Sequence, residues 1–494
     1  MKKRIIISAV FVTVFFASII TRLGYIALSG SFAVGETYNS YTLLIDSKSP
    51  NLYYHNYKRL TNNTYEKYAL LKPNAKTLAE LPKLFNNTEE IINELKKGKP
   101  LLEKTDIESS EYIPIINVSS SDYNCKQLIS RECSGLLKYL PVSIGEKRMR
   151  FHVDALGRML TGDEGTVIDD NYVSSEGLLL TLDSEIQNIA YNACKSVKSG
   201  CVIIMDVNSS SIVACVTKPD ESYLNKPFLQ YSVGSVFKLI IAACAIENNI
   251  SINYTCNGKI KIRDTEYTCQ NNKEHKSQNL EQALVNSCNC YFINLAEILG
   301  AKRIIETAQK FGFGNDIKIY KDWIFKGSSL PSADDMNNDG ELPLIGFGQG
   351  KLMSTPVQFC NALCTIANGG YYNRIKLVLA EINKYGEQSL IKYTNKNRVI
   401  SKNSSELLLK YMRSVVKNGS GKNADYKNES AGKTATAQTG QIKNGRELLN
   451  TWFAGVYPYT GPKYAIVVMV EDGISGAESC CPVFRTIVEK LGAM

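Results

Sequence analysis

Ser235 and Lys238 stand three residues apart at the start of an apolar stretch that runs from Leu239 to Ile246. On a helix, residues with this spacing share one face, so the serine hydroxyl and the lysine amine can approach each other. Burial disfavours the charged amine, so we expect a lowered pKa for Lys238, whose neutral form could accept the serine proton. Backbone N–H groups at the helix N-terminus could stabilise an oxyanion. The pair is therefore a candidate nucleophile and base for acyl transfer.

The Ser-x-x-Lys spacing alone is a weak indication, because the chain repeats it at Ser389, Ser414 and Ser430. The pair at Ser235 differs from these because two later segments carry side chains that would complement it.

The first of these segments is Ser287-Cys288-Asn289, which follows a predicted helix that begins near Leu280. It offers a hydroxyl for proton relay and an amide that could hold a substrate carbonyl. The second is Lys433-Thr434-Ala435-Thr436, which precedes a predicted turn at Gln438 to Gly440. Its lysine could bind a carboxylate. The three segments together supply the groups that an acyl-transfer site needs.

The composition counts against several other functions. The net charge of +9 comes from 57 basic and 48 acidic residues spread along the chain, whereas nucleic-acid binders concentrate their charge. We therefore expect no nucleic-acid partner. The histidines, His55, His152 and His275, form no pair with zinc-site spacing, and no Cys-x-x-Cys occurs, so we expect no metal and no cofactor. No histidine lies near a G-x-S-x-G motif, so the base is not expected to be histidine.

The fourteen cysteines do not resemble a disulfide framework. Four lie inside apolar runs and are expected to be small buried side chains: Cys215, Cys244, Cys360 and Cys364. Cys256 and Cys269 flank a short polar loop and are the best candidates for a disulfide.

The N-terminus predicts a membrane anchor. Lys2, Lys3 and Arg4 precede residues 5–24, which are mostly apolar and have about the 20 residues needed to cross a bilayer. Basic residues favour the cytoplasmic side. We expect residues 1–28 to be a cytoplasmic stub and single transmembrane anchor in the cell membrane, with the remainder outside the cell. A cleaved signal peptide is the alternative.

Beyond this segment the chain divides in two. Residues 29–175 are polar, with short apolar alternations, and are expected to form a strand-rich, non-catalytic pedestal or interaction domain. Residues 176–494 predict an α+β domain with an antiparallel sheet. Its expected strands are Leu178–Leu182, Val202–Met205, Ile212–Val216, Trp452–Val456 and Tyr464–Val470, and Val483–Leu491 is a predicted closing helix.

Six segments, in order, resemble the transpeptidase domain of penicillin-binding proteins, a group of serine acyltransferases. They are GLLLTLDSEIQNIAYNAC, YSVGSVFKL, SCNCYF, GFGQGKLMSTPVQ, AGKTATAQTG and TWFAGVYPYTGPKYAIVVMVEDG. The resemblance extends from about Gly177 to the C-terminus. It implies the penicillin-binding transpeptidase fold.

The resemblance also implies a role for each site residue. Ser235 would be acylated by the penultimate D-alanine of a peptidoglycan stem peptide, and Lys238 would take its proton. Ser287 would pass a proton to the leaving D-alanine, and Asn289 would hold the substrate backbone. The third segment would bind the substrate and its terminal carboxylate through Lys433, Thr434, Ala435 and Thr436. The backbone N–H groups of Ser235 and Thr436 would form the oxyanion hole.

The anchor followed by a non-catalytic region resembles the monofunctional class B enzymes. This implies inhibition by β-lactam antibiotics and a polymerising membrane glycosyltransferase as a partner. Two other functions stay open at this point: a catalytically weak structural protein of the wall-synthesis complex, and a β-lactam hydrolase or sensor.

One departure from the family pattern is Ala435, which stands where the family usually has glycine. We expect its Cβ to intrude on the strand edge where the substrate backbone pairs.

Overall fold

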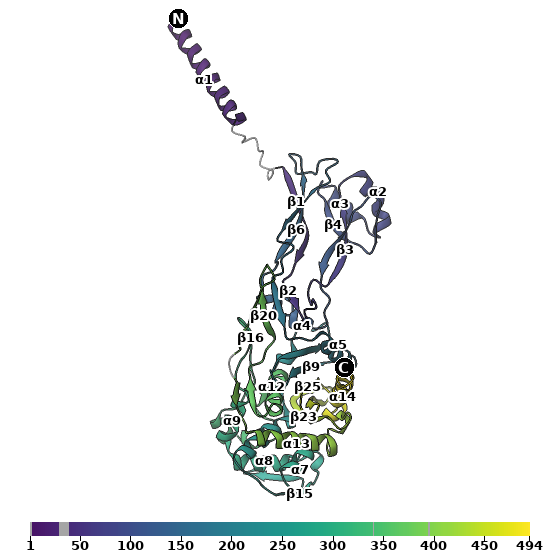
Figure 1. Ribbon diagram of the computed structural model, residues 1–494, viewed down its shortest axis with the longest axis vertical. Helices are drawn as coiled ribbons and strands as arrows, with labels where there is room; N and C mark the ends of the chain where they lie inside the picture. The colour runs from purple at the N-terminus through teal and green to yellow at the C-terminus, as the bar shows by residue number, and fades with distance from the viewer. Residues whose placement is uncertain (1, 29–38, 339, 394–395) are drawn as a thin grey trace. The chain divides into compact units, whose positions relative to one another are not determined.

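The computed structural model describes residues 2–28, 39–338, 340–393 and 396–494 (Figure 1). The chain forms two compact units. The N-terminal unit comprises Met1–Ser49, Asn62–Ser121 and Ser143–Ser174, and the C-terminal unit comprises Pro50–Thr61, Asp122–Val142 and Ser175–Met494. Residues 29–38, which the sequence analysis placed at the start of the pedestal domain, lie outside the described residues.

The N-terminal unit contains two three-stranded antiparallel sheets. The first consists, in spatial order, of β1 (Ser40–Lys48), β6 (Gly145–His152) and β7 (Thr166–Asp170). The second consists of β4 (Leu101–Lys104), β3 (Thr64–Leu71) and β5 (Ile115–Ser120), with α2 (Ala75–Leu84) and α3 (Glu89–Leu95) beside it. Leu71, Leu81 and Leu95 form a small apolar core between this second sheet and the two helices.

The segment expected to cross a membrane forms one continuous helix, α1 (Lys2–Leu28). Within the described part of the chain, no helix has the length and apolar character that a membrane span requires. The predicted transmembrane helix is therefore not confirmed.

Two short segments belong to the C-terminal unit although they fall, in sequence, between strands of the N-terminal unit. The sequence analysis assigned both to the pedestal domain. β2 (Asn51–Tyr53) pairs in parallel with β8 (Gly177–Leu180), in a sheet that continues through β20 (Val378–Ile382) and β21 (Gln388–Leu390). α4 (Lys126–Ile129) and η1 (Leu136–Tyr139) form the second segment. The physical reason is burial, because Leu52, Leu128 and Leu136 belong to the main core of the C-terminal unit.

A five-stranded antiparallel sheet forms the centre of the C-terminal unit (Figure 1). Its strands, in spatial order, are β10 (Ile212–Lys218), β9 (Gly200–Asp206), β25 (Tyr464–Glu471), β24 (Arg446–Tyr457) and β23 (Ala431–Lys443). The helices that cover it are α5 (Ser184–Ala193), α14 (Cys481–Leu491) and α12 (Pro356–Ala367). Val202 and Ile204 pack with α5 and α14, whereas Ile203 and Met205 pack with α12, as the two-residue period of a strand requires. The predicted α+β class is confirmed.

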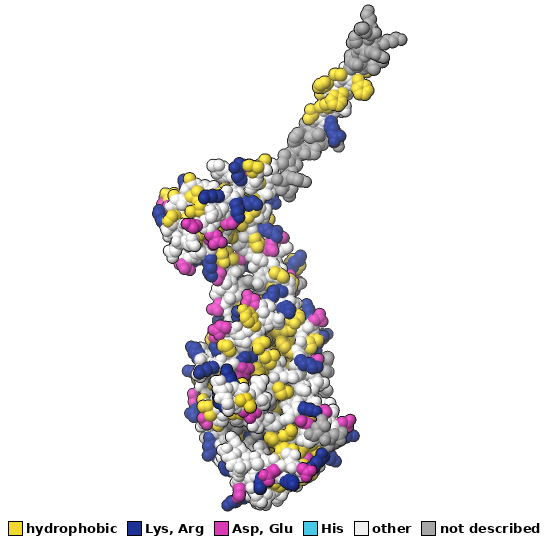
Figure 2. All heavy atoms as spheres, turned by 180° about the vertical axis from the view of Figure 1, so that it is seen from behind, with side chains coloured by type: hydrophobic (Ala, Val, Ile, Leu, Met, Phe, Trp, Pro, Cys, Tyr) yellow, Lys and Arg dark blue, Asp and Glu magenta, His cyan; other side chains and the backbone are white. Residues whose placement is uncertain are grey.

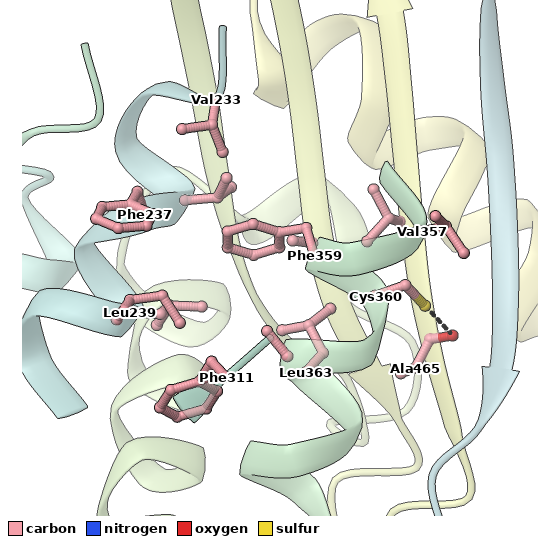
Figure 3. Close-up of a cluster of buried hydrophobic side chains, with 14 of the residues drawn as sticks. Val233, Phe237, Leu239, Phe311, Val357, Phe359, Cys360, Leu363 and Ala465 are labelled. Atoms are coloured by element: carbon pink, nitrogen blue, oxygen red, sulfur yellow. Dashed lines mark hydrogen bonds between the residues drawn. The ribbon is translucent and has the colours of Figure 1, made fainter. Parts of the chain in front are cut away.

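The helix α6 (Lys238–Glu247) is buried from Lys238 to Ala245, as its continuous apolar sequence predicts. Figure 3 shows how this region packs onto the sheet: Phe237 and Leu239 lie on one side of α12, opposite Phe359 and Leu363. On the sheet side of α12, the Cys360 thiol donates a hydrogen bond of 3.3 Å to the Ala465 carbonyl. The helix that carries Lys238 is therefore fixed by the domain core.

The remaining elements complete the C-terminal unit. The helices are η2 (Lys226–Phe228), η3 (Gly234–Phe237), η4 (Gln270–Asn272), α7 (Leu280–Val285), α8 (Asn289–Leu299), α9 (Ala301–Lys310), α10 (Ala333–Asn338), α11 (Glu341–Gly346), α13 (Lys402–Asn418), η5 (Lys422–Ala424) and η6 (Gly476–Cys480). The strands are β11 (Tyr231–Ser232), β12 (Tyr254–Cys256), β13 (Lys259–Ile262), β14 (Thr265–Thr268), β15 (Lys276–Gln278), β16 (Ile317–Tyr320), β17 (Trp323–Phe325), β18 (Met353–Ser354), β19 (Tyr371–Asn373) and β22 (Lys396–Arg398). On the face seen in Figure 2, basic and acidic side chains are interspersed, as the spread of charge along the sequence predicts.

All fourteen cysteines are buried free thiols. This confirms the prediction for the four in apolar runs. The disulfide predicted between Cys256 and Cys269 is not formed, because their Sγ atoms are 3.7 Å apart, whereas a disulfide bond measures about 2.05 Å.

The substitution Phe359→Ala should lower the free energy of unfolding by about 3–5 kcal/mol, because it leaves a cavity in the core of α12 and the sheet. Denaturant unfolding of the full chain measures this loss. Tyr385→Ala is the control, since Tyr385 is 76% exposed, and it should change the free energy by less than about 0.5 kcal/mol. An unchanged free energy in Phe359→Ala would contradict this account of the core.

Candidate active site

Ser235 lies in η3, the single turn that leads directly into α6. Gly234, Val236 and Phe237 are buried, whereas Ser235 is partly exposed. The Lys238 N–H donates to the Ser235 carbonyl and so closes the turn. The predicted nucleophile is therefore held rigidly at the start of the buried helix with its side chain accessible.

Lys238 is completely buried, and its amine has specific partners. Nζ donates to the Ser287 carbonyl at 2.8 Å and to Asn289 Oδ1 at 2.8 Å, and it lies 3.5 Å from Ser287 Oγ. The amine also stands 5.5 Å from the centre of the Phe292 ring. Burial lowers the pKa of Lys238 to about 8, as the sequence predicts, because desolvation disfavours the charged form. A large fraction of this amine is therefore neutral near pH 8.

Ser287 lies between α7 and α8 with a left-handed backbone, φ +51°. This conformation is unfavourable for a residue with a Cβ, and it lets the Ser287 carbonyl and hydroxyl both face Lys238. Asn289 is oriented by two contacts, since its Nδ2 donates to the Thr268 carbonyl at 3.1 Å while its Oδ1 accepts from Lys238. The second segment thus provides the partners of the buried amine.

Lys433 approaches the same serine from β23, the edge strand of the main sheet. Its Nζ donates to Ser287 Oγ at 3.0 Å and to the Thr434 carbonyl at 2.9 Å. Burial, and then the positive charge of Lys238, hold the pKa of Lys433 well below its usual value. Ser287 Oγ therefore lies between two buried amines, an arrangement suited to proton relay.

The other residues of the third segment alternate between the two faces of the strand. The Thr434 side chain is buried, and its hydroxyl is hydrogen-bonded to Ser420, so the structure does not bring it to the predicted carboxylate site. Thr436 is partly exposed, and its Oγ1 accepts from the Gly476 N–H at 3.3 Å. Of the two threonines, Thr436 is the one whose side chain is open to a ligand.

Ala435 is only 3% exposed and belongs to the main core. A Cβ placed on Gly234 would lie 3.3 Å from the Ala435 Cβ and 3.0 Å from the Ala437 Cβ. The Ala435 methyl group thus points towards Gly234. The expected intrusion of this methyl group on the open strand edge is not what the structure has, because the strand pleat directs it inward.

The loop Gly348-Gln349-Gly350, part of the GFGQGKLMSTPVQ segment, supports the nucleophile turn, a role that the sequence analysis did not predict. Gly234 N–H donates to the Gly348 carbonyl at 2.8 Å. A Cβ on Gly348 would lie 1.9 Å from the Gly234 carbonyl oxygen, so glycine is required there for close approach. Trp452 adds a second support, because its Nε1 donates to the Ser232 carbonyl at 3.0 Å. The sequence shows this loop as a motif, but it does not show that the loop contacts Gly234.

A pocket of about 990 Å³ lies close to this site. Ser232, three positions before the candidate nucleophile, lines it together with Thr439 and Gln441 of β23. The predicted catalytic residues do not line it. The pocket therefore adjoins the candidate active site along β23 and is not the reaction centre.

Comparison with known proteins agrees with this geometry. The sequence model of the family "Penicillin binding protein transpeptidase domain" matches residues 200–489. The peptidoglycan D,D-transpeptidase FtsI homolog of Mesostigma viride is 28% identical over 64% of this chain and 61% of its own length. Stage V sporulation protein D of Bacillus subtilis is 25% identical over 95% of this chain and 82% of its own length. The chain thus spans less than two thirds of the first of these relatives.

Solved structures share the fold. Penicillin-binding protein 3 of Mycobacterium tuberculosis, complexed with aztreonam, has a TM-score of 0.64 at 18% identity, covering 92% of this chain and 97% of that one. A ceftriaxone acyl-enzyme complex of penicillin-binding protein A from M. tuberculosis has a TM-score of 0.58 at 21% identity, covering 64% and 79%. The match of the family model to more than half of the residues confirms the resemblance seen in the motifs, and the chain belongs to the penicillin-binding protein transpeptidase family.

Proposed function

We propose that this protein is a peptidoglycan D,D-transpeptidase that cross-links stem peptides through an acyl-enzyme on Ser235. The observation that carries the proposal is the position of the Lys238 amine, which is fully buried and bonded to the second segment beside the nucleophile turn. The name of a relative supports the same reaction, since the FtsI homolog of Mesostigma viride is named a peptidoglycan D,D-transpeptidase.

In the first step, Ser235 Oγ attacks the carbonyl carbon of the penultimate D-alanine, and neutral Lys238 takes the hydroxyl proton. The backbone N–H groups of Ser235 and Thr436 would stabilise the oxyanion. The C–N bond then breaks, and the terminal D-alanine leaves after its nitrogen receives a proton through Ser287. In the second step, an amine of a neighbouring stem attacks the ester carbonyl and passes a proton to Lys238. The bond between the carbonyl carbon and Ser235 Oγ then breaks as Lys238 returns this proton to Oγ.

Substrate binding in this scheme uses the groups that face the site. Asn289 would hold the substrate backbone, and Lys433 with Thr436 would bind the terminal carboxylate. Thr434 would support the strand through Ser420, which modifies its predicted role. The same groups would accept the carboxylate of a β-lactam, and the ceftriaxone acyl-enzyme of a relative with this fold supports that expectation.

The cellular setting is part of the proposal. An anchor within residues 1–28, a catalytic domain outside the cell membrane and a polymerising glycosyltransferase partner all stay predictions from the sequence and the family resemblance. The scaffold alternative lacks a specific supporting contact, since the Ala435 methyl group on which it depended is buried.

Labelling of the full chain with a fluorescent penicillin tests the nucleophile. The wild type should form one stable adduct, and Ser235→Ala should form none, because the ester oxygen is lost. Ser389→Ala is the matched control, since Ser389 begins another Ser-x-x-Lys pair and is exposed. An adduct that persists in Ser235→Ala would refute the assignment. With a stem-peptide donor and an acceptor amine, wild type should release D-alanine, and a labelled but inactive chain would favour the scaffold.

The rate of acylation should rise with pH up to about 8 and then level off, because only the neutral Lys238 amine can act as base and its pKa is about 8. Below that pH the rate should fall about tenfold for each unit. Lys238→Met should lower the rate by at least 100-fold or so, whereas Lys392→Met, in the exposed Ser389 pair, should leave it unchanged. A flat pH profile in the wild type would exclude Lys238 as the base.

The substitution Ala435→Gly distinguishes a buried methyl group from one that blocks the substrate. Because the methyl group packs towards Gly234, its removal should cost about 0.5–1 kcal/mol of stability and should not accelerate acylation by penicillin. Stopped-flow acylation and denaturant unfolding of the same preparation measure the two effects. Faster acylation in Ala435→Gly would show that the methyl group hinders the substrate.

A further inference from the structure

The segment of residues 251–277, between α6 and α7, has almost no hydrophobic core of its own. It carries β12, β13, β14 and the first two residues of β15, yet its buried positions are Cys256, Gly258 and Cys269. Ile252, Tyr254 and Ile260 are only partly buried where they pack against the main core. A module of this size rarely buries enough apolar surface to hold its shape without a disulfide or a metal. Its two buried side chains are both thiols, and they are not joined as a disulfide.

Two further donors meet these thiols. His275 lies just before β15, and Cys288 is the N-cap of α8 and the middle residue of the second catalytic segment. The three Sγ atoms and a ring nitrogen of His275 all lie within 4.8 Å of one another. The three cysteines are buried, and His275 is partly exposed at the opening of the cluster. Four potential metal ligands thus converge from separate elements.

Three of the six distances among these four atoms match those of a tetrahedral zinc site. Ligand bonds of about 2.3 Å to sulfur and 2.05 Å to nitrogen imply about 3.8 Å between two sulfurs and about 3.6 Å between sulfur and nitrogen. Cys269 Sγ lies 3.7 Å from Cys256 Sγ and 3.7 Å from Cys288 Sγ. Cys256 Sγ lies 3.6 Å from His275 Nδ1. These three contacts fit four ligands around one ion.

Backbone N–H groups already point at two of the sulfurs. The Gly258 N–H lies 3.4 Å from Cys256 Sγ, and the Tyr291 N–H lies 3.4 Å from Cys288 Sγ. Such donors stabilise a thiolate and orient it, which is the usual contribution of the groups around a metal ligand. Gly258 has φ +86°, and a Cβ there would lie 2.4 Å from the Asn272 carbonyl oxygen. The tight turn after Cys256 therefore requires glycine.

We infer that Cys256, Cys269, His275 and Cys288 bind one Zn²⁺ ion that fixes residues 251–277 to the catalytic segment around Asn289. Three thiolates and one imidazole in tetrahedral geometry favour zinc over the oxygen-preferring divalent ions. A closed set of four protein ligands makes the site structural. This inference departs from the expectation of no metal site, and it does not rest on the proposed transpeptidase activity.

The ion would affect catalysis by holding the Asn289 side chain in position. Cys288 stands between Ser287 and Asn289, and the Thr268 carbonyl that holds the Asn289 amide precedes Cys269. Cys288 is thus the chain neighbour of Asn289 itself, and Cys269 is the chain neighbour of the residue whose carbonyl holds the Asn289 side chain. Loss of the ion should loosen both sides of this amide and so displace a partner of Lys238.

Measurement of bound zinc in the full chain, purified under reducing conditions, tests the site. We expect about one zinc ion per chain, and less than about a tenth of that in Cys269→Ala and in His275→Ala, because loss of one ligand weakens the site strongly. His275 is partly exposed, so its replacement removes a ligand without removing a side chain from the core. Cys290→Ala is the matched control: Cys290 Sγ lies 3.5 Å from Cys269 Sγ but stands outside the group of four.

The two proposals give separate results. Ser235→Ala should retain its zinc while losing the penicillin adduct. Chelation of the wild type should lower its acylation rate at least about tenfold, and added Zn²⁺ should restore it. Zinc-free wild type with an unchanged melting temperature on addition of Zn²⁺ would overturn the inference. A zinc-free chain whose disulfide is mapped by peptide mass analysis to Cys256 and Cys269 would also overturn it, because that bond would occupy the site.

Discussion

The active site depends on keeping the amine of Lys238 out of water. A buried ammonium group without partners would cost several kcal/mol or more, so each surrounding element must either provide an acceptor or tolerate a neutral amine. The Ser287 carbonyl and Asn289 Oδ1 are the acceptors, and the lowered pKa reflects the remaining cost. The left-handed backbone of Ser287 follows from the same requirement, because it turns the carbonyl towards the amine. The core around α6 and α12 keeps these groups at hydrogen-bonding distance.

A second lysine makes the arrangement reactive as well as stable. Lys433 comes from the edge strand of the sheet, whereas Lys238 comes from the central helix, and both approach Ser287. Two amines this close to one hydroxyl disfavour full protonation of both, because each positive charge raises the cost of the other. Ser287 Oγ, which accepts from Lys433 and lies 3.5 Å from the Lys238 amine, is the group placed to carry a proton between them. The nucleophile turn has its own support, the close contact of Gly234 with Gly348.

Local patterns in the sequence predicted much of this site. The apolar run after Lys238 predicted a buried helix, and a lowered pKa for its first residue followed from burial. The two-residue period of a strand places Lys433 and Thr434 on opposite faces, which the motif alone does not show. The cluster of Cys256, Cys269, His275 and Cys288 has no short spacing that would predict it, because these ligands meet only after β12, β15 and α8 fold together. The buried contacts of Leu52 and Leu128 were missed for the same reason, since long-range packing leaves no local period.

The parallel pairing of β2 with β8 has a consequence for how the chain is made. Asn51 leaves the ribosome long before its partner Gly177, and residues 62–121 and 143–174 of the other unit are synthesised in between. Pairings that span so much sequence form late and slowly. The N-terminal unit can therefore complete its sheets first, while β2 waits as an unpaired segment for the rest of its sheet. An expression fragment that starts at residue 176 would lack this strand, and its exposed β8 edge would be a site for aggregation.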